Sequence, residues 1–257
     1  MHSTSYTIKL QKIICDAPAK SFVLGIKSFN GYSSCTKCIV DGDYMNGRVC
    51  FLQNNSTLRT DEYFKSKIYD DYHKAYTPVE EIDIGLVTNV TLDYMHLVLL
   101  GIMKRLIQFW VKGNKSVRLP EQHGNAICKT LQKMRASITP EFSRLPRPLY
   151  EIDKWKATEL RQFLFYTGPI VLKDYLSREM YYHFLALHCG MRILASQDLC
   201  ITYNVNARQS LEYFIKKFGT IYGHEHINHN VHNLIHLNDE VLKFGVIIWY
   251  NLWSRTY

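Results

Sequence analysis

Hydrophobic and polar residues alternate over 6–10, at the start of the chain. This period of two is typical of a β-strand, and it becomes fully apolar at 13–15, as in a strand buried on both faces. Asp16 and Pro18 then suit the first turn of a helix, which we expect to end at Gly31. The pattern therefore predicts a strand, an acidic residue and a helix in succession.

A hairpin and a series of helices are predicted after this start. Residues 41–52 contain short strand-like runs around a turn, which is typical of a β-hairpin. From Thr60 onwards the helical period dominates, and Thr60 is suited to cap the first of these helices. Pro140, Pro146 and Pro148 break the helical pattern and mark a candidate linker. The expected helices cover 60–76, 92–112, 121–136, 156–176, 178–195, 207–222 and 232–243.

The composition is that of a folded protein. Of the 257 residues, 47% are hydrophobic and 21% are charged, a balance that buries a core and excludes extensive disorder. The stretches without charged residues are shorter than the ~18 apolar residues of a membrane-spanning helix. The first ten residues lack the apolar run and cleavage site of a secretory signal. We therefore expect an intracellular protein that is not secreted and does not enter a membrane.

The net charge of +8 is concentrated in one segment. Residues 101–150 contain ten Lys and Arg residues against two acids, Glu121 and Glu141, whereas residues 51–100 are net acidic. Such a segment favours a polyanionic partner, with nucleic acid first and an acidic membrane surface second. A solvated helix face explains the charge equally well.

Two of the seven cysteines, Cys35 and Cys38, are close together in the sequence. Their Cys-x-x-Cys spacing lets two thiolates bind one Zn²⁺. A redox pair normally opens a helix after a strand, whereas these residues follow a Gly-Tyr-Ser-Ser loop, so the redox interpretation is weaker. Two unreacted thiols in a turn are the remaining alternative.

A second pair of metal-binding side chains lies near the other end of the chain. His232 and His236 are four residues apart, so on a helix their imidazoles project from one face. Together with the two cysteines they would complete a tetrahedral site and fasten the end of the helical region to the start of the chain. Several other histidines lie nearby, but Leu234 and Ile235 favour an amphipathic helix at these two.

Three further polar residues lie where chemistry could occur. Asp16 follows the first predicted strand, where catalytic carboxylates often lie, although geometry alone favours a role as the N-cap of the helix that begins there. Asp93 and His96 are one turn apart at the start of the helix predicted from residue 92. They could orient a neighbouring ligand, or they could be an ordinary N-terminal acid and a hydrogen-bonded histidine.

Five blocks of sequence share their order with a known family. They are Cys15-Asp16-Ala17-Pro18-Ala19, Gly31-Tyr32 through Cys35-Thr36-Lys37-Cys38, Leu92-Asp93-Tyr94-Met95-His96-Leu97, Trp155-Lys156-Ala157-Thr158-Glu159 and Asn230-Val231-His232-Asn233-Leu234-Ile235-His236-Leu237. Together they resemble the blocks of animal CACTA (En/Spm)-type transposases over roughly residues 13–245. That family is similar in layout to the recombination-activating recombinase.

The resemblance implies an RNase H-like core in which three carboxylates hold two Mg²⁺ or Mn²⁺ ions for DNA cleavage and strand joining. It makes Asp16 the second of these acids, and Asp93 with His96 the family's Asp-x-x-His pair. It also implies DNA as a partner, through the basic segment 101–150, and the nucleus as the location. The structural zinc ligands that it implies are Cys35, Cys38, His232 and His236.

The implied fold is mostly α with a small α/β start. It consists of a partial RNase H-like strand–helix unit with the Cys-x-x-Cys turn over 1–58, a helical, zinc-containing insertion domain over 59–245 and a divergent tail over 246–257.

Two of the family's catalytic acids have no counterpart in this chain. None of the fifteen residues before Asp16 is Asp or Glu, and Arg255-Thr256 stand where the family has a Phe-Glu pair. One carboxylate cannot hold two hard cations, so we expect a truncated transposase-like protein that keeps zinc and DNA binding without catalysis. Two alternatives are an active nuclease or transposase whose missing acids come from a partner or another exon, and a host protein-interaction module that kept only the fold.

Overall fold

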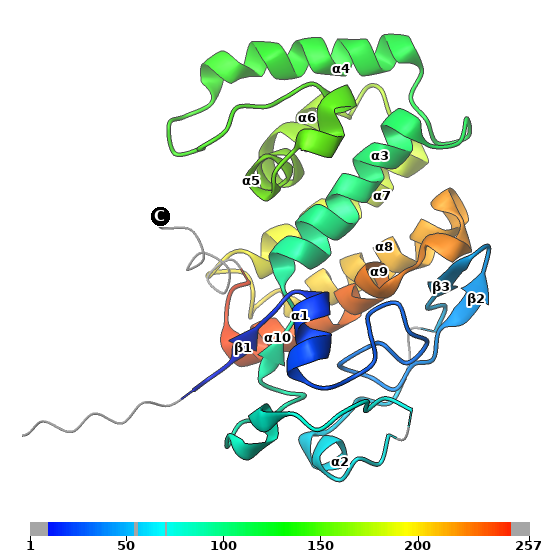
Figure 1. The fold of residues 1–257 in the computed structure, drawn as a ribbon. Coiled ribbons are helices and arrows are strands. Elements are labelled where there is room, and N and C mark those ends of the chain that lie inside the picture. Colours follow the sequence, from blue (N-terminus) through cyan, green and yellow to red (C-terminus); the bar gives the residue numbers. More distant parts are fainter. Residues whose placement is uncertain (1–9, 54–55, 70, 248–257) are drawn as a thin grey trace, which may run out of the picture.

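The computed structural model describes residues 10–53, 56–69 and 71–247, and helices make up most of them (Figure 1). In Figure 1 the long helices occupy the upper part of the molecule, with α4 at its outer edge, and α2 lies at the opposite, lower end. The prediction of a mostly helical protein with a small strand-containing start is therefore confirmed.

The start of the chain forms one strand and one short helix. Strand β1 (Ile13–Ile14) pairs in parallel with β4 (Val90–Thr91). Helix α1 (Ala17–Val23) is shorter than predicted, because Gly25 adopts a φ of +59° and ends it well before Gly31. The residues of the predicted strand before residue 10 lie outside the described part of the chain.

A hairpin and a short helix follow. Strands β2 (Asp43–Met45) and β3 (Arg48–Cys50) pair in antiparallel fashion around Asn46 and Gly47, whose φ angles are 49° and 79°, so the predicted hairpin is confirmed. Thr60 caps α2 (Asp61–Lys65), as predicted. The helix was expected to reach residue 76 but ends at 65, and Lys67 has a φ of 56°, which an α-helix cannot accommodate.

The long helices agree closely with the helical period of the sequence. The observed helical elements after residue 77 are η1 (Pro78–Glu81), η2 (Met95–Met103), α3 (Lys104–Lys112), α4 (Glu121–Met134), η3 (Arg135–Ser137), η4 (Leu149–Lys154), α5 (Ala157–Gln162), η5 (Phe163–Thr167), α6 (Gly168–Val171), α7 (Arg178–Leu194), α8 (Asn204–Tyr222), η6 (His224–His226), α9 (His229–Asn233), η7 (Leu234–His236) and α10 (Leu237–Phe244). Each predicted helix from residue 92 onwards has a counterpart among them.

Hydrophobic residues form one large core and two smaller ones. The large core extends from Leu92 to Ile247 and contains Ile127 of α4 as well as Leu149 of η4. Pro140, Pro146 and Pro148 lie between these two residues, so the predicted linker does not separate two cores. A second core contains eight buried side chains that come from before and after the domain boundary predicted at residue 58: Leu24, Ile26, Phe64, Tyr72, Ile84, Leu86, Val87 and Val90.

The third and smallest core decides the position of the site. Cys35 and Cys38 are buried in it together with Val40 and Phe51, which flank the hairpin. The RNase H-like core implied by the resemblance stays a prediction, because the described residues contain one short parallel strand pair. The division at residues 58 and 245 likewise stays a prediction, and residues 248–257 of the predicted tail lie outside the described part.

Candidate metal centre

Four side chains predicted to bind zinc meet in the interior. The Sγ atom of Cys35 lies 3.4 Å from Nε2 of His236, and that of Cys38 lies 3.3 Å from Nε2 of His232. The two Sγ atoms are 3.5 Å apart. All four residues are buried, and their ligand atoms lie within 4.8 Å of one another. The chain therefore brings two thiols and two imidazoles together around one point.

The spacing of these atoms suits a tetrahedral ion. Zn²⁺ binds sulfur at about 2.3 Å and nitrogen at about 2.0 Å, which places neighbouring ligands about 3.3–3.8 Å apart. The distances between the donor atoms fall within this interval or close to it. The Cys2His2 group could thus hold a metal ion such as zinc, with four protein ligands and no position left for water or substrate.

The cysteine pair is held by a loop that is anchored on both sides. Cys38 forms a β-bridge with Leu58, and the backbone amide of Arg59 donates to the carbonyl of Lys37 at 2.9 Å. The Arg59 side chain donates to the carbonyl of Cys35 at 3.0 Å and is stacked over the ring of Tyr72. A buried guanidinium therefore fixes the backbone that presents the first thiol.

The histidine pair comes from a helix that tightens between its two members. His232 belongs to α9 and His236 to the 3₁₀ turn η7, so they do not share the regular α-helix that the sequence predicted. The predicted convergence of their imidazoles is nevertheless confirmed by the contacts with the two thiols. Asn228 caps α9 by accepting the amide proton of Val231 at 3.2 Å, which fixes the start of this segment.

The two thiols differ in acidity. Burial opposes ionisation of Cys35, but the hydrogen bond from the Cys38 thiol and the charge of His236 bring the pKa of Cys35 well below its ordinary value. The hydrogen bond to Cys35, together with burial, raises the pKa of Cys38. The amide of Lys37 also donates to the Cys35 sulfur at 3.4 Å. Cys35 is therefore the thiol prepared to be a thiolate, which is the form that binds metal.

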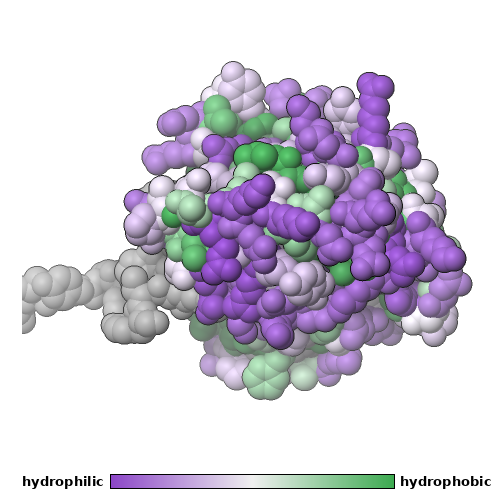
Figure 2. Space-filling view, turned by 90° about the horizontal axis from the view of Figure 1, so that it is seen from above, coloured by the Kyte–Doolittle hydropathy of each residue, from purple (hydrophilic) through white to green (hydrophobic). Residues whose placement is uncertain are grey.

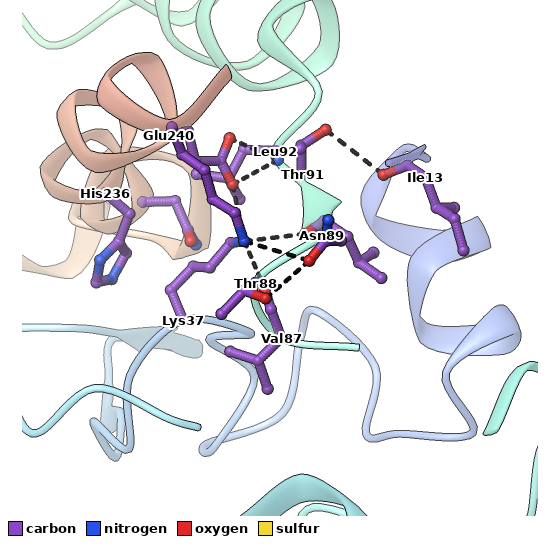
Figure 3. Close-up of polar contacts among 12 residues, drawn as sticks. Ile13, Lys37, Val87, Thr88, Asn89, Thr91, Leu92, His236 and Glu240 are labelled. Carbon is purple, nitrogen blue, oxygen red and sulfur yellow. Dashed lines mark hydrogen bonds and ion pairs between the residues drawn. The ribbon is translucent and has the colours of Figure 1, made fainter. Parts of the chain in front are cut away.

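A buried ion pair lies beside the cluster (Figure 3). Lys37 Nζ lies 2.8 Å from Oε1 of Glu240 on α10, and it donates to the carbonyls of Val87 and Val90 at 2.8 and 2.9 Å. Glu240 in turn accepts the amide proton of Leu92 at 2.9 Å. The ion pair therefore joins the cysteine loop, the strand β4 and helix α10, which follows the two histidines directly.

Sequence reasoning missed this ion pair and one neighbour of the cluster. Asn233 accepts a weak hydrogen bond from the Cys35 thiol, with its Oδ1 atom 3.6 Å from Sγ. The positions gave a usable signal, because Lys37 lies inside the Cys-x-x-Cys motif and Asn233 between the two histidines. Glu240 lies one turn after His236, but nothing in the sequence indicates which lysine it contacts.

Asp93 and His96 form the predicted pair. The Oδ2 atom of Asp93 lies 2.5 Å from Nδ1 of His96, and Oδ1 accepts the amide proton of Met95 at 2.9 Å. Asp93 therefore orients the imidazole and also accepts a backbone amide proton at the start of η2. These contacts agree with the ordinary structural role, and the imidazole of His96 is partly exposed.

Asp16 caps α1 by accepting the amide proton of Ala19 at 2.8 Å. Its neighbours in the sequence, Cys15 and Ala17, line a small cavity of about 30 Å³ together with Asp93 and His96. The buried side chain of Lys20 and the partly buried side chain of His229 also border it, and desolvation lowers the pKa of Lys20 to about 8 and that of His229 to about 4. The segment around Asp16 and the Asp-x-x-His pair thus face one another, and any catalytic role of Asp16 stays a prediction.

The basic segment 101–150 forms α3, α4 and their connections. Some of its charges are neutralised locally: Lys112 pairs with Asp153 and Arg147 with Glu159. Six others are exposed, namely Lys115, Arg118, Lys129, Lys133, Arg135 and Arg144. Figure 2, which views the molecule from the side of α4, shows a mostly hydrophilic face with small hydrophobic groups between. The distribution agrees with a solvated surface and equally with one that meets a polyanion.

Comparisons with known protein families and with curated proteins found no match. No model of a known protein family matches the chain. No curated protein matches it either. In the described part of the chain, no helix combines the length and the apolar character that crossing a membrane requires.

Proposed function

We propose that this chain is a protein derived from a CACTA-type transposase, in which a structural zinc ion holds the two ends of the fold together. One observation carries the proposal. The four residues that the resemblance names as zinc ligands are the four that converge, although Cys35 and His236 are 201 positions apart. The convergence supports a metal site, which is the feature that the resemblance predicts for these residues.

The proposed ion has a structural role. Four protein ligands fill a tetrahedral site, and a buried site of this kind has no open position for a water molecule or a substrate. The neighbouring ion pair between Lys37 and Glu240 crosses between the same two segments, so the metal would complete a closure that the polypeptide already begins. Binding of the ion would therefore contribute directly to the free energy of folding.

We further propose that the protein binds DNA and does not cleave it. The exposed basic side chains around α4 supply a surface for phosphate groups, and the nucleus is the location that such a role implies. Asp16 is the one family acid with a counterpart here, and one carboxylate cannot hold two cations that each favour six or more oxygen ligands. This polypeptide by itself is thus expected to perform no strand transfer.

Metal analysis of the purified protein tests the proposal. We expect one Zn²⁺ per chain, and we expect Cys35→Ser and His236→Ala to lose it. Cys200→Ser is the matched control, because Cys200 is also buried but lies outside the cluster. Protein that contains no zinc after expression in zinc-supplemented medium, or equal zinc in all four samples, would contradict the proposal.

A second candidate is an active nuclease that takes its other acids from a partner. The cavity shared by the neighbours of Asp16 with Asp93 and His96 favours this candidate. A cleavage assay on duplex DNA with Mg²⁺ or Mn²⁺ separates the two when it is run in a nuclear extract, which supplies the partner. Turnover that disappears in Asp16→Ala supports the nuclease, and its absence in the unmodified protein supports the non-catalytic function.

A further inference from the structure

Two arginines from distant parts of the chain meet at a single imidazole nitrogen. Arg48 of strand β3 places Nη1 2.5 Å from Nδ1 of His226, and Arg105 of helix α3 places Nη2 3.1 Å from the same atom. His226 belongs to η6, immediately before the histidine segment of the metal cluster. The two guanidinium groups are therefore held close together, at a place where the hairpin meets the helices.

The surrounding residues hold this arrangement in place. The guanidinium of Arg105 lies over the ring of Phe109, 5.0 Å from its centroid, and the ring of His226 packs edge-on against Phe109 at 4.9 Å. The amide of Phe51, just after the hairpin, donates to the carbonyl of Ile227 at 2.8 Å. Both Arg105 and His226 thus rest on one aromatic ring, and a backbone hydrogen bond fixes the hairpin beside them.

The donors at this place exceed the acceptor that they share. A neutral imidazole offers one lone pair, whereas each guanidinium carries five N–H donors. Glu225 lies on the other side of His226, with Oε1 3.9 Å from Nε2, too far for a hydrogen bond. Burial and the charge of Arg48 lower the pKa of Arg105. Burial followed by both guanidinium groups lowers the pKa of His226, and the Glu225 carboxylate opposes this in part. Two guanidinium groups therefore share one carboxylate neighbour and one imidazole acceptor, and an anion with several acceptor oxygens would satisfy more of their donors.

We propose that Arg48, Arg105 and His226 form a binding site for a phosphate group. Guanidinium forks match the oxygen atoms of carboxylates and phosphates, and two forks that approach from different elements suit an anion with several acceptor oxygens arranged tetrahedrally. A phosphate oxygen would replace the imidazole nitrogen as the acceptor that both arginines share. His226, once freed from them, could donate a third hydrogen bond.

The site is distinct from the metal cluster. Arg105 belongs to the basic segment 101–150, whereas Arg48 and His226 lie outside it, and the exposed lysines and arginines around α4 take no part in the site. The phosphate could belong to a nucleic-acid backbone or to a small phosphate compound. The two sources share the same chemistry, and separate titrations with inorganic phosphate and with duplex DNA distinguish them.

The test compares two double variants of the full chain that lose the same charge. Arg48→Gln with Arg105→Gln removes both forks, and Lys173→Gln with Lys216→Gln is the control, since both lysines are exposed and outside the site. Titration calorimetry measures inorganic phosphate, and fluorescence anisotropy measures a short DNA duplex at several salt concentrations. Arg48→Gln alone serves as a third variant, because Arg48 is exposed on the hairpin and its loss leaves the core intact.

We expect the arginine double variant to bind inorganic phosphate about tenfold more weakly or worse, and the lysine double variant to bind it as the unmodified protein does. If DNA affinity falls in parallel and the slope of its salt dependence decreases by about one unit per lost phosphate contact, the natural source is nucleic acid. If DNA affinity changes equally in both double variants, the site serves small phosphate compounds. Absence of phosphate binding, or equal phosphate affinity in all variants, would overturn the proposal.

Discussion

His183 is a buried residue whose charge state affects stability. It lies on α7 and stacks on the ring of Phe214 with centroids 4.1 Å apart, while its Nε2 atom lies 3.0 Å from the Phe214 carbonyl. Burial lowers the pKa of His183 from 6.5 to about 4. The folded protein therefore keeps this imidazole neutral at a pH where the unfolded chain protonates it.

Acidification should destabilise the protein through this residue. Because the folded pKa lies below the unfolded one, stability is unaffected above pH 6.5, falls as the pH drops from 6.5 to about 4, and levels off below. The full change is on the order of 3 kcal/mol. Urea unfolding of the unmodified protein and of His183→Gln at pH 7, 5.5 and 4 measures it.

The difference in unfolding free energy between the two proteins isolates the effect of His183, because all other titrating groups contribute equally to both. His183→Gln keeps a donor for the Phe214 carbonyl and cannot be protonated in this range. A pH dependence that stays the same in the variant would show that this imidazole titrates as freely in the folded state as in the unfolded chain.

At the scale of elements, replacement by alanine should change the free energy of unfolding in opposite directions at two glycines, although both have room for a side chain. A Cβ atom at Gly47 or at Gly124 would meet no other atom within 4 Å. Gly47 lies in the hairpin turn with a φ of +79°, which L-residues rarely adopt, whereas Gly124 lies in α4. Backbone conformation alone therefore separates the two positions.

We expect Gly47→Ala to lower the free energy of unfolding by about 1 kcal/mol and Gly124→Ala to raise it by about 0.5–1 kcal/mol. The measurement is chemical denaturation of the two variants beside the unmodified protein, and each variant is the control for the other. Two shifts of the same sign would mean that the turn or the helix does not have the conformation described here.

At the scale of the molecule, the four-ligand cluster connects segments that the chain separates widely. The cysteine loop packs with the hairpin in the smallest core, and the histidines border the largest one. A metal ion at this position would therefore tie two cores to each other. Its removal should release the hairpin side from the helices before the helices themselves unfold.

Removing zinc with a chelator should lower the melting temperature by about 10 °C or more, because structural zinc contributes several kcal/mol and each kcal/mol shifts a protein of this size by about 2–4 °C. Differential scanning calorimetry with and without the chelator gives the shift. The Cys35→Ser protein should melt at the lower temperature and show no response to the chelator. An unmodified protein that is indifferent to the chelator would argue against a stabilising ion.

The amino-acid sequence by itself determined the features that depend on neighbours along the chain. The helices from residue 92 onwards, the hairpin around Asn46 and Gly47, and the cap at Thr60 follow from local periodicity, turn geometry and capping. The Cys-x-x-Cys and the two histidines were also recognisable, because a metal ion demands particular donor atoms at particular spacings. Each of these signals is complete within a few residues.

Only the tertiary structure decided which distant residues meet. It paired Ile13 with Val90 and joined Lys37 to Glu240. The convergence of two arginines on His226 also arises there. Such contacts depend on how the elements pack, and neither a lysine nor an arginine carries in its local sequence any mark of the partner that packing will bring to it.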